Sequence, residues 1–186
     1  MTTVFIAGSI SIKTLDYKVK QRIDNIVGQN YSILVGDADG VDASIQSYLF
    51  DANANNTVVY CSGSAPRNNL GRWPVKAIEA GELKPGSRAF FTAKDVAMAE
   101  DADFGLMIWD SKSSGTLSNV IELLSRNKKS VVFVNKTKLF QNVGDVFQLE
   151  ELLTFMSPLA LQKVDTKIGL MRRIAQLKNE QIDMFI

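Results

Sequence analysis

Two short segments of this sequence combine glycine with hydroxyl and carboxylate side chains. The first, residues 36–42, reads Gly-Asp-Ala-Asp-Gly-Val-Asp, and the second, residues 110–116, reads Asp-Ser-Lys-Ser-Ser-Gly-Thr. Each follows a short apolar run and precedes an amphipathic one, which is the order of a strand, a loop and a helix. At the carboxyl end of a parallel strand, such a loop presents backbone amides and a helix N-terminus to an anionic ligand. The two loops therefore predict a site for a nucleotide or a similar phosphorylated molecule.

The second loop has the residue types that suit a phosphate. Ser113, Ser114 and Gly115 are small enough to let the backbone approach a ligand closely. The Thr116 hydroxyl can cap the helix that follows or donate to a phosphate oxygen. Asn119 lies one helical turn further along the same side. We expect all five to contact the ligand.

The first loop is acidic and suits a different part of the ligand. Its carboxylates, Asp37, Asp39 and Asp42, would repel a bare phosphate but can accept hydrogen bonds from ribose hydroxyls or from a base. Asp42 can instead cap the following helix. Gly36 and Gly40 serve the backbone geometry of the loop. We expect this loop to line the ligand site as well.

Four more residues complete the predicted ligand site. Gly8 and Ser9 end the first apolar run of the chain, and Asp110 opens the second loop. Arg67 is the expected side-chain ligand of a phosphate, because its guanidinium can form two parallel hydrogen bonds. It belongs to a stretch, residues 61–94, with six basic residues against two acidic ones, whereas the whole chain has a net charge of +1. This stretch is either a solvated basic face or a phosphate-facing surface.

The absence of histidine limits the chemistry. It excludes Ser-His-Asp and Cys-His nucleophile systems and the common histidine-containing zinc sites. Any catalysis must then use carboxylates, hydroxyls or lysine, and the candidates that we single out are Asp37, Asp110 and Glu122. We expect no metal and no cofactor. The lone Cys61 cannot form an internal disulfide, and we find no signal peptide and no membrane-spanning run, so we expect a cytoplasmic protein that contacts no membrane.

Hydrophobic periodicity predicts alternating strands and helices. The expected strands are 4–7, 33–35, 57–61, 104–109 and 130–134, and the expected helices are 15–27, 41–49, 92–101, 117–124, 146–155 and 167–178. Such alternation predicts an α/β fold with a parallel sheet of about five strands covered by helices on both faces. Residues 62–91 are expected to form a long irregular connection of the kind that often serves binding. We expect one domain over residues 1–156 and a C-terminal helix and tail over 157–186.

Three segments in this order resemble the SLOG superfamily, which includes the DprA and LOG proteins. They are Val-Phe-Ile-Ala-Gly-Ser at 4–9, the first loop with its strand end at 35–42, and Ile-Trp with the second loop at 108–116. The resemblance covers about residues 3–135. It implies a three-layer Rossmann-like fold, a nucleotide or nucleotide-derived ligand at these loops, and a homo-oligomer; some members cleave an N-glycosidic bond.

One departure from that superfamily bears on catalysis. The LOG enzymes carry a catalytic glutamate three positions after the threonine of their Gly-Thr pair, where this chain has Asn119. An amide cannot act as general base or nucleophile, and Glu122 lies almost one turn further on. The resemblance therefore favours ligand binding over catalysis.

The end of the chain carries a separate motif. Residues 181–185, Gln-Ile-Asp-Met-Phe, resemble the peptide by which bacterial polymerases and repair proteins dock on the sliding clamp. Gln181 would enter a polar subsite, while Met184 and Phe185 would fill an apolar pocket. Alternatively, the apolar side chains fold back onto the core.

Three functions remain open from the sequence. The first is a sensor or nucleic-acid-processing accessory protein that binds a nucleotide. The second is a nucleoside or nucleotide N-glycosidase or deoxyribosyltransferase-like enzyme. The third is an adaptor that binds single-stranded DNA through the basic stretch and the sliding clamp through its tail.

Overall fold

A seven-stranded sheet forms the centre of the molecule. The computed structural model describes the backbone of residues 1–79 and 81–183 and the side chains of residues 1–79 and 81–179. The strands have the order β4-β3-β2-β1-β5-β6-β7, and all neighbours are parallel except β6 and β7. Their bounds are β1 (Thr3–Gly8), β2 (Ser32–Gly36), β3 (Thr57–Ser62), β4 (Val75–Ile78), β5 (Phe104–Trp109), β6 (Lys129–Val134) and β7 (Leu139–Val143). The predicted Rossmann-like α/β fold is confirmed, with two strands more than expected.

The two additional strands are the edges of the sheet. In β4 the first three residues are exposed, and in β7 only Val143 is buried. An edge strand has one neighbour and solvent on its other side, so it does not need the apolar run that marks a central strand. This is why the periodicity did not reveal β4 within the connection 62–91.

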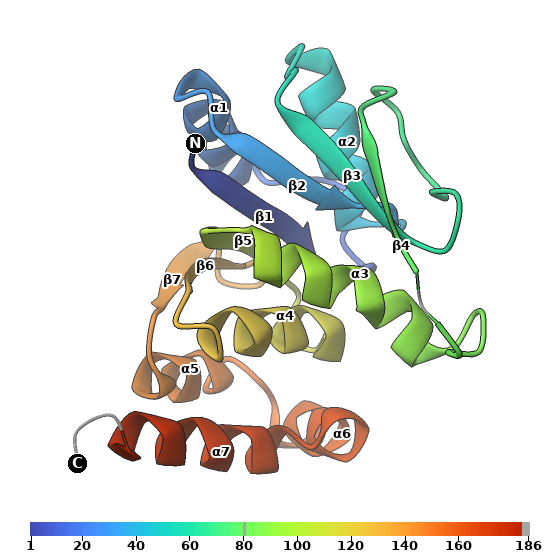
Figure 1. The fold of residues 1–186 in the computed structure, drawn as a ribbon. Coiled ribbons are helices and arrows are strands. Elements are labelled where there is room, and N and C mark those ends of the chain that lie inside the picture. The colour runs from blue at the N-terminus through green and yellow to red at the C-terminus, as the bar shows by residue number, and fades with distance from the viewer. Residues whose placement is uncertain (80, 184–186) are drawn as a thin grey trace.

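Helices cover both faces of the sheet (Figure 1). α1 and α2 lie on one face, and α3, α4 and α5 lie on the other, with α6 and α7 forming a further layer beneath them. The bounds are α1 (Tyr17–Gly28), α2 (Val41–Asp51), α3 (Arg88–Asp101), α4 (Ser114–Leu124), α5 (Val146–Leu153), α6 (Pro158–Ile168) and α7 (Leu170–Asp183).

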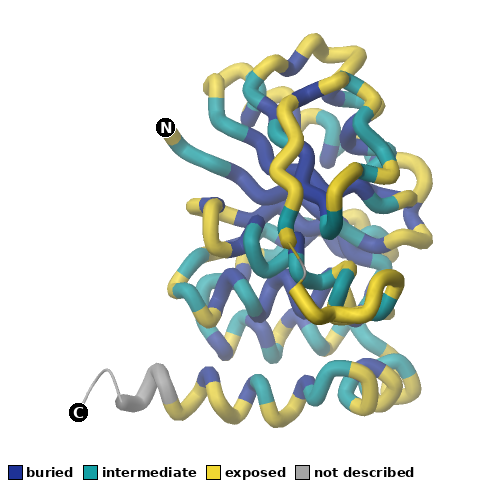
Figure 2. The backbone as a smooth tube through the Cα atoms, turned by 45° about the vertical axis from the view of Figure 1, so that its right-hand side comes forward, coloured by how far each residue is buried: buried dark blue, intermediate teal, exposed yellow. Residues whose placement is uncertain are grey.

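The sheet separates two apolar cores, and Figure 2 shows the buried backbone at the centre of the molecule. Ile6, Val35 and Ile45 belong to the core under α1 and α2, whereas Phe5 and Val120 belong to the core under α3 and α4. Successive residues of β1 thus face opposite cores, as the period of a strand requires. Burial on both faces explains why the central strands read as continuous apolar runs.

Two helix boundaries differ from the prediction. α3 begins one turn earlier than expected, because Ser87 is its N-cap and accepts a hydrogen bond from the Phe90 amide (3.1 Å), while the Thr92 hydroxyl donates to the Arg88 carbonyl (2.6 Å) inside the helix. The single helix expected at 167–178 is wrong: there are two, separated by Gly169 in the left-handed conformation (φ 63°).

The C-terminal helices pack on the rest of the fold. Val164, Leu170, Ile174 and Leu177 are buried in the core under α3 and α4. The division into residues 1–156 and 157–186 stays a prediction. Within the part of the chain that the structure describes, no helix has the length and apolar character needed to cross a membrane.

Candidate functional site

The loops after β1 and β5 meet where the strand order reverses. β1 and β5 are neighbours, with Gly8 opposite Ile108, and the Ser9 amide donates to the Ile108 carbonyl (2.9 Å). A Cβ atom at Gly8 would collide with that carbonyl oxygen, so the close approach requires glycine. In open α/β sheets this reversal point, at the carboxyl ends of the strands, is where ligands bind.

Hydroxyl groups tie the two loops together. The buried Ser9 hydroxyl lies 3.3 Å from the Thr116 hydroxyl and accepts a hydrogen bond from the Asp110 amide (3.1 Å). Asp110 in turn accepts from the Ser11 hydroxyl (2.6 Å) and the Ser113 amide (2.7 Å). Burial alone would raise the pKa of Asp110, but these hydrogen bonds outweigh it and hold the pKa below its ordinary value. Asp110 is thus an ionised structural acceptor, and a general acid is not expected there.

The N-terminus of α4 is open toward solvent. Ser113, and not Thr116, is the N-cap: its hydroxyl accepts from the Thr116 amide (3.4 Å), while the Thr116 hydroxyl points back to Ser9. The amides of Ser114 and Gly115 donate to no other described residue. A Cβ atom at Gly115 would meet nothing closer than the Ser113 hydroxyl at 3.9 Å. These two amides are therefore available to an anion.

A cavity of about 620 Å³ lies over this helix end, between α3, α4 and α6. One face of α3 lines it through Arg88, Phe91, Thr92 and Asp95, which have the i, i+3, i+4, i+7 spacing of a helical stripe. Residues 113–115 line the opposite side, together with Ser118.

The charge of this cavity is predominantly positive. Arg88 and Lys112 line it from α3 and the second loop, and Lys163 and Lys167 line it from α6. None of these four cations forms an ion pair with a described carboxylate. Arg88 donates instead to the Ser114 hydroxyl (3.3 Å) at the start of α4. Asp95 is the single carboxylate among the described residues of the lining.

Arg67 lies outside this set of free cations. Its Nε and Nη2 atoms donate to the two oxygens of Asp37 (3.0 and 2.8 Å), and its backbone amide donates to the same carboxylate (3.0 Å). Burial raises the pKa of Asp37, but these hydrogen bonds and the charges of Lys94 and Arg67 lower it by more. The pKa of Asp37 therefore lies below its ordinary value. The Arg67 guanidinium also lies 4.6 Å from the centre of the Phe91 ring. Because the Asp37 carboxylate already balances the charge of Arg67, we expect Arg67 to attract a phosphate less strongly than Arg88 does.

A buried lysine joins the first loop to α3. Lys94 Nζ lies 3.0 Å from Asp95 Oδ1, 3.5 Å from Asp42 Oδ2 and 3.9 Å from Asp37 Oδ1. Burial raises the pKa of the Asp42 carboxyl to about 6, although the charge of Lys94 acts in the opposite direction. At Lys94, burial alone would lower the pKa, but the surrounding carboxylates outweigh it and raise the pKa. A Cβ atom at Gly36 would collide with both the Asp42 carboxylate and the Lys94 ammonium. Asp42 therefore pairs with Lys94, and the N-cap of α2 is Gly40.

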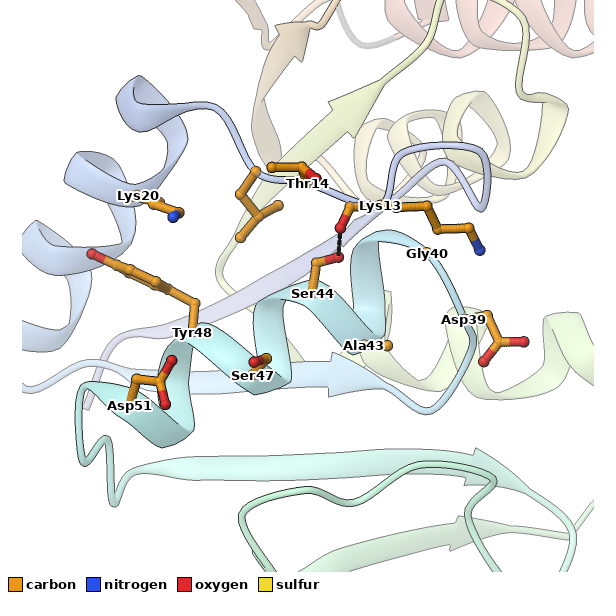
Figure 3. A pocket seen from close by; sticks show the side chains of 11 residues that line it. Lys13, Thr14, Lys20, Asp39, Gly40, Ala43, Ser44, Ser47, Tyr48 and Asp51 are labelled. Carbon is orange, nitrogen blue, oxygen red and sulfur yellow. Dashed lines mark hydrogen bonds between the residues drawn. The ribbon is translucent and has the colours of Figure 1, made fainter.

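Asp39 and Gly40 face a different cavity, of about 470 Å³, between α1 and α2 (Figure 3). Lys13, Ser44 and Tyr48 also line it, and the Ser44 hydroxyl donates to the Lys13 carbonyl (2.8 Å). This cavity and the 620 Å³ cavity at the second loop share no described lining residue, and a single site lined by both glycine loops stays a prediction. Ser9 and Thr116 join the second glycine loop to the loop after β1, and Lys94 joins the first glycine loop to α3.

The remaining candidates lie away from the free groups of the cavity between α3, α4 and α6 or outside the described residues. Glu122 pairs with Arg126 and Arg173 (2.6 Å each). Asn119 is buried, and its Oδ1 atom has no described hydrogen-bond partner. The predicted clamp-binding residues fall on the tail: Met184 and Phe185 lie outside the described residues, as does the side chain of Gln181.

The basic stretch 61–94 does not form one surface. Lys76 pairs with Asp101 (2.6 Å), Lys94 is buried, and Arg67 is bound to Asp37. The cationic cavity instead takes two lysines from α6. The sequence signals that could have revealed α6 are the Ser157 cap followed by Pro158, and Gly169 at its end.

Comparison with known proteins supports the fold. No protein-family model matches this sequence, and no curated protein matches it. Among solved structures, the chain is similar to DNA processing protein A from Helicobacter pylori, with a TM-score of 0.57 and 18% identity over 90% of this chain and 80% of that one. That protein is described as having a unique mode of binding single-stranded DNA. The two chains share a Rossmann-like α/β architecture.

Proposed function

We propose that this protein binds single-stranded nucleic acid through its phosphate groups, as an accessory protein of nucleic-acid processing, and that the cavity between α3, α4 and α6 is the site. The observation that carries the proposal is the set of four cations, Arg88, Lys112, Lys163 and Lys167, which line one cavity without a carboxylate partner among the described residues. Lysine and arginine without internal partners are the usual ligands of phosphates.

Two further features support a phosphate ligand. The free amides of Ser114 and Gly115 begin α4 at the same cavity, and a helix N-terminus favours negative charge. The fold is similar to that of a protein described as binding single-stranded DNA. A mononucleotide could use the α4 end alone, whereas lysines on α6 extend the positive charge toward neighbouring phosphates.

The enzymatic alternative has less support. Asp110 and Glu122 already accept hydrogen bonds or pair with arginines, and Asp37 is held by Arg67. A general acid or base must be free to reach the proton that it transfers. We therefore propose binding without cleavage.

The test is binding of a fluorescent twelve-nucleotide single strand, measured by anisotropy over a range of salt concentrations. Contacts with about four phosphates would make the logarithm of the binding constant fall with the logarithm of salt concentration with a slope of roughly −3, at about 0.7 per phosphate of a single strand. Lys163→Glu should weaken binding and reduce this slope by about 0.7 or more. The control Lys136→Glu makes the same charge change at an exposed lysine between β6 and β7.

Equal affinities and slopes for Lys163→Glu and Lys136→Glu would contradict the assignment of the cavity. A mononucleotide that competes as well as the oligonucleotide would show that the ligand is the free nucleotide and not the polymer.

A further inference from the structure

The cationic cavity contains one group that phosphate binding alone does not need. Asp95 brings a carboxylate into a lining whose other described polar groups are cations, hydroxyls and free amides. Its side chain is only 21% exposed, so solvent screens its charge incompletely. A carboxylate at this place repels phosphate, unless the ligand has a hydrogen-bond donor that it accepts.

A hydrogen bond from the buried Lys94 holds the Asp95 carboxylate in position. Lys94 Nζ donates to Asp95 Oδ1 (3.0 Å), and Lys94 is itself buried between three carboxylates. The other oxygen, Oδ2, accepts no hydrogen bond from any described residue. The neighbouring Thr92 hydroxyl is used within α3, where it donates to the Arg88 carbonyl. Asp95 is therefore the pre-organised acceptor on this face of α3.

The spacing along α3 separates this acceptor from Arg88, the cation that contacts the start of α4. Arg88 contacts Ser114 at the start of α4, and Asp95 follows seven residues later on the same face. Seven residues of helix correspond to about 10 Å along the axis. A nucleotide with its phosphate held by Arg88 would thus have room to extend its sugar or base toward Asp95.

We propose that Asp95 is a specificity-determining residue of this site, which accepts a hydrogen bond from an O–H or N–H donor of the bound nucleotide. The donor is either the 2′-hydroxyl of a ribose or an N–H group on the Watson–Crick edge of a base. This inference rests on the proposed binding of nucleic acid at the same cavity.

Two matched pairs of oligonucleotides distinguish the two sources of the donor. Twelve-nucleotide strands of uridine and deoxyuridine differ in the sugar hydroxyl, and strands of thymidine and N3-methylthymidine differ in the base N–H. An abasic strand of the same length has neither donor. The wild type should prefer the member with the donor in one of the pairs by at least about tenfold, as a hydrogen bond to a charged group allows.

Asp95→Asn should move the affinities in opposite directions. It should reduce that preference to less than about threefold, because the amide oxygen is a weaker acceptor than a carboxylate. It should also strengthen binding of the abasic strand by about two- to fivefold, because a like charge is removed. Asp51→Asn, at an exposed carboxylate on α2, is the control and should change neither.

A second variant distinguishes a lost hydrogen bond from a misfolded protein. Asp95→Glu keeps the charge but displaces the oxygens, so it should lose the preference without strengthening the abasic strand. The inference is overturned if the wild type shows no preference in either pair, or if Asp95→Asn changes all strands by one common factor. Failure of the proposed function looks different, because the wild type would then bind none of the strands at low salt.

Discussion

Replacing Asp42 by asparagine should change the free energy of unfolding more favourably at neutral pH than at acidic pH, when variant and wild type are compared at the same pH. The Asp42 carboxyl is buried 3.5 Å from Lys94 and accepts a hydrogen bond from the Ala38 amide (3.3 Å). Burial raises its pKa to about 6 despite Lys94, and nearby Asp95 and Asp37 add to that effect. The folded protein thus binds this proton more tightly than the unfolded chain does.

The sign and size follow from that difference. A group whose pKa is raised on folding favours the folded state at low pH, and this contribution is lost as the pH rises through the folded pKa. The pKa of Asp42 rises from about 3.9 in the unfolded chain to about 6 in the folded protein. The corresponding loss of folding stability is roughly 3 kcal/mol, of which about 2 kcal/mol falls between pH 4.5 and 7.5. Asparagine does not titrate, so the variant lacks this loss.

The assay is urea unfolding of both proteins at four pH values from 4.5 to 7.5. The free energy of unfolding of Asp42→Asn minus that of the wild type should rise by about 2 kcal/mol across this range, which corresponds to roughly 4–8 °C in melting temperature. Taking the difference cancels the other titrating groups. Asp39→Asn makes the same change at an exposed residue of the same loop and is the control. A flat difference for Asp42→Asn would refute the argument that burial dominates at this carboxyl.

Three other predictions concern the loops, the chemistry and the tail. Gly36→Ala should destabilise the fold by about 1–3 kcal/mol in urea unfolding, because the new methyl group would meet Asp42 and Lys94, whereas Gly28→Ala, with open space around it, should be neutral or stabilising by up to about 1 kcal/mol. Nucleoside 5′-monophosphates incubated with the protein should release no free base by chromatography; a base peak that scales with protein concentration would restore the enzymatic alternative. Removal of residues 181–186 should abolish capture by an immobilised bacterial sliding clamp and leave oligonucleotide affinity unchanged; undiminished capture would show that the tail is not the docking peptide.

The sequence predicted the central part of the fold well. The strands β1, β2, β3, β5 and β6 are buried on both faces, so each reads as an apolar run with a glycine or polar residue at its end or directly after it. The edge strands β4 and β7 and the helix α6 were missed, because exposed strands lack that run and because α6 buries only Val164.

The site was predicted less completely, for a reason that lies in the helices. The glycine loops are visible in the sequence because they are local, but the cavity is lined by side chains from α3, the second loop, α4 and α6 that are far apart in the chain. The stripe from Arg88 to Asp95 becomes apparent only once α3 is known to begin after Ser87. Arg67 was expected to bind phosphate, because its pairing with Asp37 thirty residues away is not visible in the sequence.

Lys94 couples the first glycine loop electrostatically to the cavity between α3, α4 and α6. It contacts Asp42 in the first loop and Asp95 at the cavity, and the negative charge of Asp95 raises the pKa of Asp42. An O–H or N–H donor that hydrogen-bonds Asp95 would partly offset its negative charge and so ease ionisation of Asp42. Thermodynamic reciprocity then requires that ionisation of Asp42 strengthen the attraction of that donor. Occupancy of the cavity and release of a proton from a carboxyl that is not part of its lining are in this way one coupled equilibrium.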